Sequence, residues 1–250
     1  MALSNPAMGV LNRAASGEFN FGGLGDTATL SGTTTKSILL VAITFIVGYA
    51  SMIYSLGYII EHNGASPNLL MYGSIIAAVV VAMITIFKPE ASPFTAPAYA
   101  VCEGAGLGTL SAFFELRYPG IVATAVMSTF VVLMAMLALW KFRIIVPTAR
   151  FRSVVMGATC GIAILYLLNF VLRLFDIPLL PSTGGLAIAI SLIVCTIAAL
   201  NLVLDFDMIE QSVNEGLPKY FEYYCSFSLL VTICWLYLEI LRLLSISNRE

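Results

Sequence analysis

Charged residues are scarce in this chain. Asp, Glu, Lys and Arg make up only 10% of its 250 residues, against about 25% in an average soluble domain. Hydrophobic residues make up 60%. A soluble core of this size does not need so much apolar material, so the composition predicts a membrane protein. A nucleic-acid partner would require a clustered excess of basic residues, which a formal net charge of −2 argues against.

Histidine is nearly absent, and this limits the chemistry that the chain can support. The one histidine, His62, falls in an expected loop, and the five cysteines lie in or beside apolar runs without a CxxC pair. We therefore expect no metal cluster, no cofactor and no disulfide framework. The motifs HExxH and GxSxG are missing as well, so we expect no enzymatic activity.

Long apolar runs dominate instead. A helix needs about 20 mostly apolar residues to cross about 30 Å of hydrocarbon. Seven stretches reach that length and the connections between them are short, so we predict an all-α polytopic bundle of seven transmembrane helices in one domain. The expected spans are Ile38–Ile60, Leu69–Phe87, Pro93–Phe114, Ile121–Trp140, Ser153–Leu172, Leu186–Leu204 and Tyr223–Leu244.

The N-terminal segment differs in composition from the rest. Residues 1–36 are rich in Gly, Ser, Thr and Asn, and they lack the basic region and apolar stretch of a signal peptide. We expect a flexible tail over residues 1–36 and a transmembrane domain over residues 37–247.

Basic residues favour one side of the predicted bundle, which indicates its orientation. Short cytoplasmic loops carry an excess of Lys and Arg. The N-terminal tail and alternate loops carry eight basic residues, four of them within residues 141–152, and the opposite side carries four. We therefore expect the N-terminus in the cytoplasm. The first set is Arg13, Lys36, Lys88, Lys141, Arg143, Arg150, Arg152 and Lys219, and the second is Arg117, Arg173, Arg242 and Arg249.

Acidic residues interrupt or border the apolar runs. A carboxylate at bilayer depth is costly and marks a functional site by default. Glu103 lies deepest, so it must be protonated, paired or exposed to a water-filled cavity. Glu239 has Arg242 three residues later, and a local ion pair is the alternative to a functional role there. Our candidates for an ion pathway and pH gate are Asp205, Glu239, Glu103, Asp207 and Glu222.

Asp205 and Asp207 lie at the end of the sixth run. Asn201 and Asp205 share a helix face, whereas Asp207 is rotated by about 200° from Asp205. We expect Asp205 to face the bundle and Asp207 the rim, and a solvated helix end is the alternative for both. Two close carboxylates in a low dielectric share a proton and can act as a latch, and their oxygens also suit Ca²⁺. The residues alone do not separate a pH-gated cation path from a proton-coupled carrier.

Five short segments spread over nearly the whole chain form a specific set. They are Ser4–Pro6, Tyr99–Gly108, Tyr118–Val122, Ala198–Ile209 and Trp235–Leu244. Together they resemble the Bax inhibitor-1 family, in particular its bacterial YccA-like branch. The resemblance implies seven helices with the last one central, a location in the bacterial inner membrane, and a pH-sensitive leak of cations, mainly calcium.

The resemblance also implies two controlling acids. Asp205 matches the acid of a Tyr-Asp-Thr-Gln-x-Ile-like motif, and Glu239 matches that of a Leu-Tyr-Leu-Asp-like motif, with Glu in place of Asp. An ideal hairpin that turns near Gly216 offsets these two acids by about 18 Å, and it places Glu222 nearer the depth of Asp205. Lys88 is a candidate for the family's basic partner.

Two functional hypotheses follow. The first is a pH-sensitive calcium or cation leak channel, in which Ca²⁺ is the transported ion and the lipid bilayer is the main partner. The alternative is a membrane interaction protein that modulates a membrane-bound protease or a stress response, as some relatives suggest. In that case a membrane protease is the partner, and its binding should depend on residues 1–36.

Overall fold

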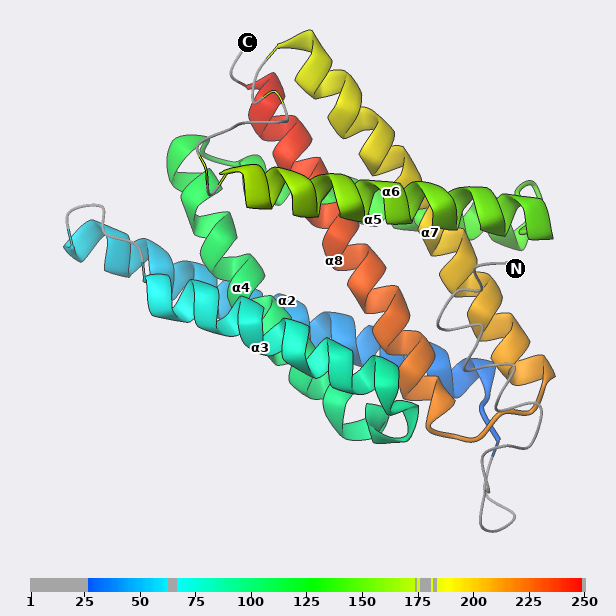
Figure 1. The fold of residues 1–250 in the computed structure, drawn as a ribbon. Coiled ribbons are helices and arrows are strands. Elements are labelled where there is room, and N and C mark those ends of the chain that lie inside the picture. Colours follow the sequence, from blue (N-terminus) through cyan, green and yellow to red (C-terminus); the bar gives the residue numbers. More distant parts are fainter. Residues whose placement is uncertain (1–26, 63–66, 174, 176–180, 182–183, 249–250) are drawn as a thin grey trace. The chain divides into compact units, whose positions relative to one another are not determined.

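The computed structural model describes residues 27–62, 67–173, 175, 181 and 184–248. Within this part the chain forms seven α-helices and one short 3-10 helix, as shown in Figure 1. The prediction of an all-α protein with seven long helices is confirmed. The elements are α2 (Leu30–Glu61), α3 (Asn68–Phe87), η1 (Pro89–Ala91), α4 (Ser92–Arg117), α5 (Ile121–Lys141), α6 (Ala149–Arg173), α7 (Gly185–Asn214) and α8 (Phe221–Ser247).

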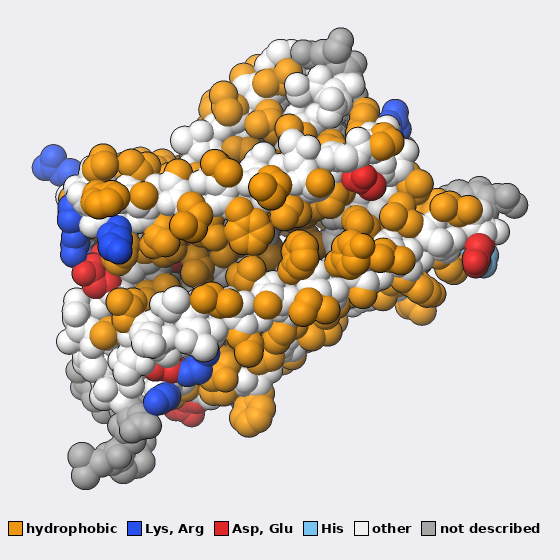
Figure 2. All heavy atoms as spheres, turned by 180° about the vertical axis from the view of Figure 1, so that it is seen from behind, with side chains coloured by type: hydrophobic (Ala, Val, Ile, Leu, Met, Phe, Trp, Pro, Cys, Tyr) orange, Lys and Arg blue, Asp and Glu red, His pale blue; other side chains and the backbone are white. Residues whose placement is uncertain are grey.

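Six of the helices are long and apolar enough to cross a membrane. The remaining one, α4, has 26 residues, but its glycines, prolines and Glu103 make it less apolar than the others. Hydrophobic side chains cover much of the face seen in Figure 2. Exposed large hydrophobic residues include Leu69 and Phe94, which are 89% and 84% exposed. Such a surface is costly in water and suits a lipid environment.

The chain folds into two compact units. Among the described residues, unit 1 contains α2, α3, η1 and nearly all of α4, together with the ends of α7 and α8 that lie within Asp207–Val231. Unit 2 contains α5, α6 and the remaining parts of α7 and α8. The two long C-terminal helices therefore contribute to both units.

The last helix is the most enclosed. In α8, 56% of the membrane-length window is buried, compared with 39% in α7 and 6% in α6. Among the six membrane-length helices, α8 has the largest buried share.

Close packing of α2 and α4 holds unit 1 together. The backbone of Gly104 lies against Thr44, and a Cβ atom at Gly108 would overlap the carbonyl of Gly48. Ser51 Oγ donates a hydrogen bond to Ala105 O across this interface (2.8 Å). Small residues that let helix backbones approach are the usual way to join helices in a membrane.

Helix α2 begins earlier than the sequence suggested. Thr29 caps α2 by accepting a hydrogen bond from Gly32 N at its hydroxyl, so the helix starts at Leu30 and includes residues 30–36, which we had assigned to the tail. Residues 1–26 of the predicted tail, and with them Ser4–Pro6, lie outside the described part of the chain.

Candidate functional site

The predicted acids occupy both units. Glu103, Asp207 and Glu222 belong to unit 1, and Asp205 and Glu239 belong to unit 2. Four of the five are buried, and Glu103 is partly exposed. Asp207 does not lie at a solvated rim as expected, because it is as buried as Asp205 and its Oδ2 accepts a hydrogen bond from Gln211 Nε2 (2.8 Å).

The most developed site in unit 2 surrounds Glu239, in the middle of the C-terminal half of α8. The hydroxyl of Tyr166 on α6 donates a hydrogen bond to Glu239 Oε1 (2.8 Å). Arg242 Nη1 donates in turn to Tyr166 Oη (2.8 Å), and its guanidinium lies 5.4 Å from the centroid of the same ring. Glu239 and Arg242 are thus joined through Tyr166, and within the described residues they do not form the direct ion pair that their spacing suggested.

The Glu239 carboxylate keeps one oxygen open. Its Oε2 atom is buried and accepts no hydrogen bond of normal geometry from the described residues. Trp235, one helical turn earlier, also interacts with the carboxylate, although not at the geometry of a normal hydrogen bond. A buried acceptor without a donor is costly unless a proton, a water molecule or a cation occupies it. The site is therefore able to take up a proton or a cation.

Asn201, on the same face of α7 as Asp205, bonds to a neighbouring helix. Asn201 Nδ2 donates to Thr159 Oγ1 on α6 and to Ile197 O, both at 2.8 Å. Asn201 thus fastens α7 to α6 within unit 2. Asp205, one turn further along, is 7% exposed.

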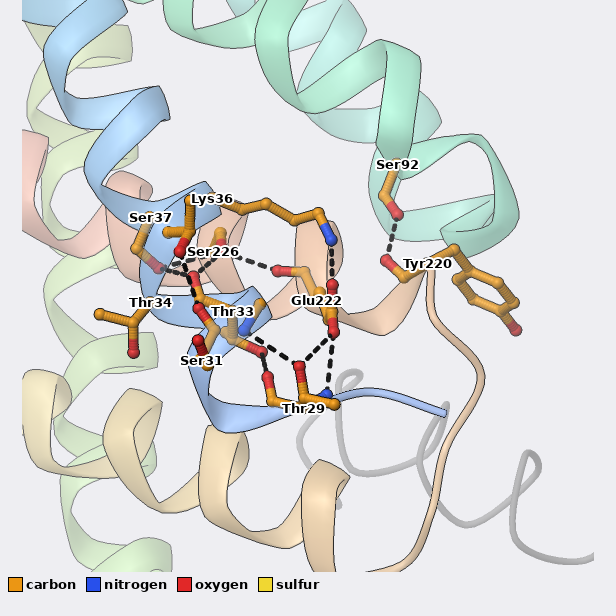
Figure 3. Close-up of polar contacts among 12 residues, drawn as sticks. Thr29, Ser31, Thr33, Thr34, Lys36, Ser37, Ser92, Tyr220, Glu222 and Ser226 are labelled. Carbon is orange, nitrogen blue, oxygen red and sulfur yellow. Dashed lines mark hydrogen bonds and ion pairs between the residues drawn. The ribbon is translucent and has the colours of Figure 1, made fainter. Parts of the chain in front are cut away.

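The most developed site in unit 1 surrounds Glu222, at the start of α8 (Figure 3). Its side chain is fully buried. Oε1 accepts hydrogen bonds from the backbone N and the hydroxyl of Thr29, both at 2.9 Å. Oε2 forms an ion pair with Lys36 Nζ, which also lies 4.7 Å from the centroid of the Tyr223 ring. Both oxygens of Glu222 are therefore occupied.

The first turns of α2 and α8 are joined around this pair. Ser226 Oγ contacts Thr33 O (3.0 Å) and Ser37 Oγ (2.9 Å), as Figure 3 shows. Gly32 faces the Glu222 carboxylate so closely that a Cβ atom at this position would overlap it. The N-terminal end of α2 is thus shaped to receive a carboxylate, which its exposed backbone N–H groups also favour.

The residues just before α2 and those just before α8 also contact each other. Ala28 N donates to Leu217 O (2.7 Å), and Thr27 forms an isolated antiparallel bridge with Pro218. Ser92 Oγ, at the start of α4, donates to Tyr220 O (2.9 Å). Burial, and then the negative charge of Glu90, raises the pKa of Tyr220 to about 12. The segment before α8 is held from two sides within unit 1.

Sequence reasoning missed several partners of these acids. Lys36 was assigned to the tail, and Tyr166 is one polar hydroxyl in an apolar run that gave no signal. Lys88, the candidate basic partner, is exposed and forms no ion pair with any described acid. In the part of the chain that the structure describes, no three His, Cys, Asp or Glu side chains group closely enough to hold a metal ion.

Comparison with known proteins identifies a family that covers nearly the whole chain. A family model described as Bax inhibitor 1 like matches residues 5–249. Comparisons with curated proteins and with solved structures gave no match. The match extends over both units and all seven long helices, and it agrees with the membrane-length helices and the motif set of the sequence. The chain therefore belongs to the Bax inhibitor 1 like family of membrane proteins.

Proposed function

We propose that this protein is a pH-sensitive leak pathway for calcium or other cations in the bacterial inner membrane, with its N-terminus in the cytoplasm and with Glu239 as its principal gating acid. The observation that supports the proposal is the environment of Glu239. Its carboxylate is buried in a membrane-spanning helix and one oxygen is held by Tyr166. The other oxygen accepts no hydrogen bond of normal geometry among the described residues, with Trp235 as its neighbour.

A carboxylate in this position can respond to two ligands. A proton on Oε2 removes the negative charge and makes burial cheaper, whereas a cation near Oε2 would be attracted to the ionised form. Tyr166 and Arg242 stabilise the ionised form, because the Tyr166 hydroxyl donates a hydrogen bond to Oε1 and Arg242 Nη1 donates one to Tyr166 Oη. Competition between protons and cations at one site would make a cation flux depend on pH.

The other acids take graded roles in this proposal. Asp205 belongs to the same unit and is buried, so it is the second candidate for the gate. Glu103 and Asp207 are candidates for the pathway in unit 1. Glu222 is the least suitable, because Lys36 and Thr29 already occupy both of its oxygens.

The test is calcium flux into liposomes that contain the purified protein and a trapped indicator. Wild-type protein should pass Ca²⁺ at a rate that changes with pH. Glu239→Gln keeps the shape of the side chain but cannot ionise, so its rate should become independent of pH. Glu61→Gln, which changes an exposed carboxylate at the end of α2, is the matched control and should behave as wild type.

Two results would count against the proposal. Wild-type liposomes with no more flux than empty ones would remove the channel function and favour a protein that acts through a membrane protease or a stress response. Flux with an unchanged pH profile in Glu239→Gln would keep the channel and remove Glu239 from its gate.

A further inference from the structure

The connection between α5 and α6 carries a cluster of basic residues. Residues 141–152 contain four Lys or Arg side chains and no Asp or Glu. Both flanking helices are long and apolar enough to span a membrane, so this connection lies at a membrane surface. We call residues 141–152 the basic loop.

Backbone hydrogen bonds fix the conformation of the basic loop. Arg143 adopts a left-handed conformation (φ 57°), and the N–H groups of Phe142 and Ile144 donate back to carbonyls in the last turn of α5. On the other side, Thr148 Oγ1 accepts a hydrogen bond from Phe151 N at the start of α6 (3.2 Å). The side chains are therefore presented from a defined turn at the end of each helix.

Cationic and apolar side chains alternate on this turn, and both kinds are exposed. Lys141 and Arg150 are exposed, and no described acid forms an ion pair with either of them. Phe142, Ile144 and Val146 are 72%, 68% and 50% exposed. In water, exposure of three large apolar side chains on one short turn would be unfavourable. At a lipid interface the same side chains enter the acyl region while the cations meet the headgroups.

The other cations of the loop have additional roles within the chain. Arg152 Nε donates to Pro147 O (3.3 Å), which helps to hold the start of α6. Arg143 also interacts within the chain. Lys141 and Arg150 are therefore the exposed cations of the loop that pair with no described acid, and Arg143 is a third exposed cation.

From these observations we propose that the basic loop is a docking surface for the headgroups of anionic phospholipids. A phosphodiester headgroup supplies the negative charge that Lys141 and Arg150 attract, and its acyl chains lie where Phe142, Ile144 and Val146 point into the interface. This inference is independent of whether the protein conducts ions.

The chain contains a natural reporter for this site. It has two tryptophans, and Trp140 immediately precedes the basic loop. Trp235→Phe leaves Trp140 as the single fluorophore. The variant is reconstituted in vesicles of phosphatidylcholine and phosphatidylglycerol in which either one or the other lipid carries brominated acyl chains at equal mole fraction. Bromine quenches tryptophan on contact, so the ratio of the two signals gives the relative binding constant of the anionic lipid at the loop.

The expected result is a preference for brominated phosphatidylglycerol of about fivefold, the order that one well-placed juxtamembrane cation provides. In the Lys141→Gln/Arg150→Gln variant the preference should be clearly smaller. Arg117→Gln/Arg173→Gln removes two exposed cations elsewhere in unit 2 and is the matched control, which should keep the preference.

A salt titration of the Trp235→Phe protein, with the loop residues unchanged, is a second test. Raising the salt concentration should reduce the preference toward equality, because the attraction between exposed charges is screened. Equal quenching by the two lipids at low salt would overturn the proposal. So would a preference that survives both high salt and the loss of Lys141 and Arg150.

Discussion

Lys36 and Glu222 are 186 residues apart in the sequence and form an ion pair that joins the start of α2 to the start of α8. The Glu222 side chain is fully buried, and that of Lys36 is 17% exposed. A buried carboxylate of this kind depends on its partner, because no solvent can replace the lost cation.

Removal of the cation alone should therefore be strongly destabilising. We expect Lys36→Met to lower the free energy of unfolding by about 3 kcal/mol, the cost of leaving a buried charge unpaired. Lys36→Met/Glu222→Gln should recover part of this loss. Unfolding in detergent, followed by circular dichroism, measures both, and Lys88→Met is the control at an exposed lysine. A double variant less stable than Lys36→Met would contradict the pairing.

The space at Gly32 provides a steric test of the same contact. Alanine at this position places a Cβ atom against the Glu222 carboxylate, and we expect Gly32→Ala to destabilise the protein by about 1 to 3 kcal/mol. Gly57→Ala is the matched change in the same helix, where nothing lies within 4 Å of the added atom. It should be neutral or stabilise by up to about 1 kcal/mol through helix propensity. Equal effects of the two changes would show that Glu222 does not approach α2 closely.

Tyr166 links Glu239 to Arg242, so Tyr166→Phe should affect the proposed gate without changing the shape of the ring. Loss of the hydroxyl removes the hydrogen bond that stabilises the ionised Glu239 carboxylate. The midpoint of the pH dependence of calcium flux should move to higher pH, because the protonated form gains relative to the ionised one. A flux assay of Tyr166→Phe across pH measures this shift. Tyr49→Phe, at a ring that is 57% exposed, is the control.

Tyr220 should contribute to the alkaline limit of stability. Its pKa is about 12 in the folded protein, against about 10 for an ordinary tyrosine. Below pH 10 the phenol is protonated in both states and contributes no pH dependence. As the pH rises from about 10 toward 12, the unfolded chain loses the proton first, so stability falls. Tyr220→Phe should show a smaller fall than wild type in thermal unfolding scans over this range, and identical curves would contradict the raised pKa.

The helices were predictable because lipid imposes a simple rule. A run of about 20 apolar residues has to satisfy its backbone internally, and in a single segment only a helix does so. Each of the seven predicted spans is accordingly helical in the structure. The start of α2 escaped this rule, because its first turns are rich in polar residues. There Thr33, Thr34 and Thr35 direct their hydroxyls to carbonyls one turn back, which lets a polar stretch remain helical.

The acids of the polar sites were predictable from the sequence, but their partners were not. The acids stood out against apolar neighbours in the sequence, and four of the five are buried in the structure. Their partners come from distant helices, and neither Tyr166 nor Lys36 carried a local signal of where it points. The spacing of Glu239 and Arg242 favoured a direct pair, but a tyrosine from α6 lies between the two charges and takes a hydrogen bond from one while giving one to the other.

The pairing of Ala28 with Leu217 and of Thr27 with Pro218 fixes where the chain enters its first helix. A peptide inserted directly before Thr27 would start from beside the link between α7 and α8. A protease site inserted just before Thr27 would become a probe of whether this entry point stays anchored when the protein works.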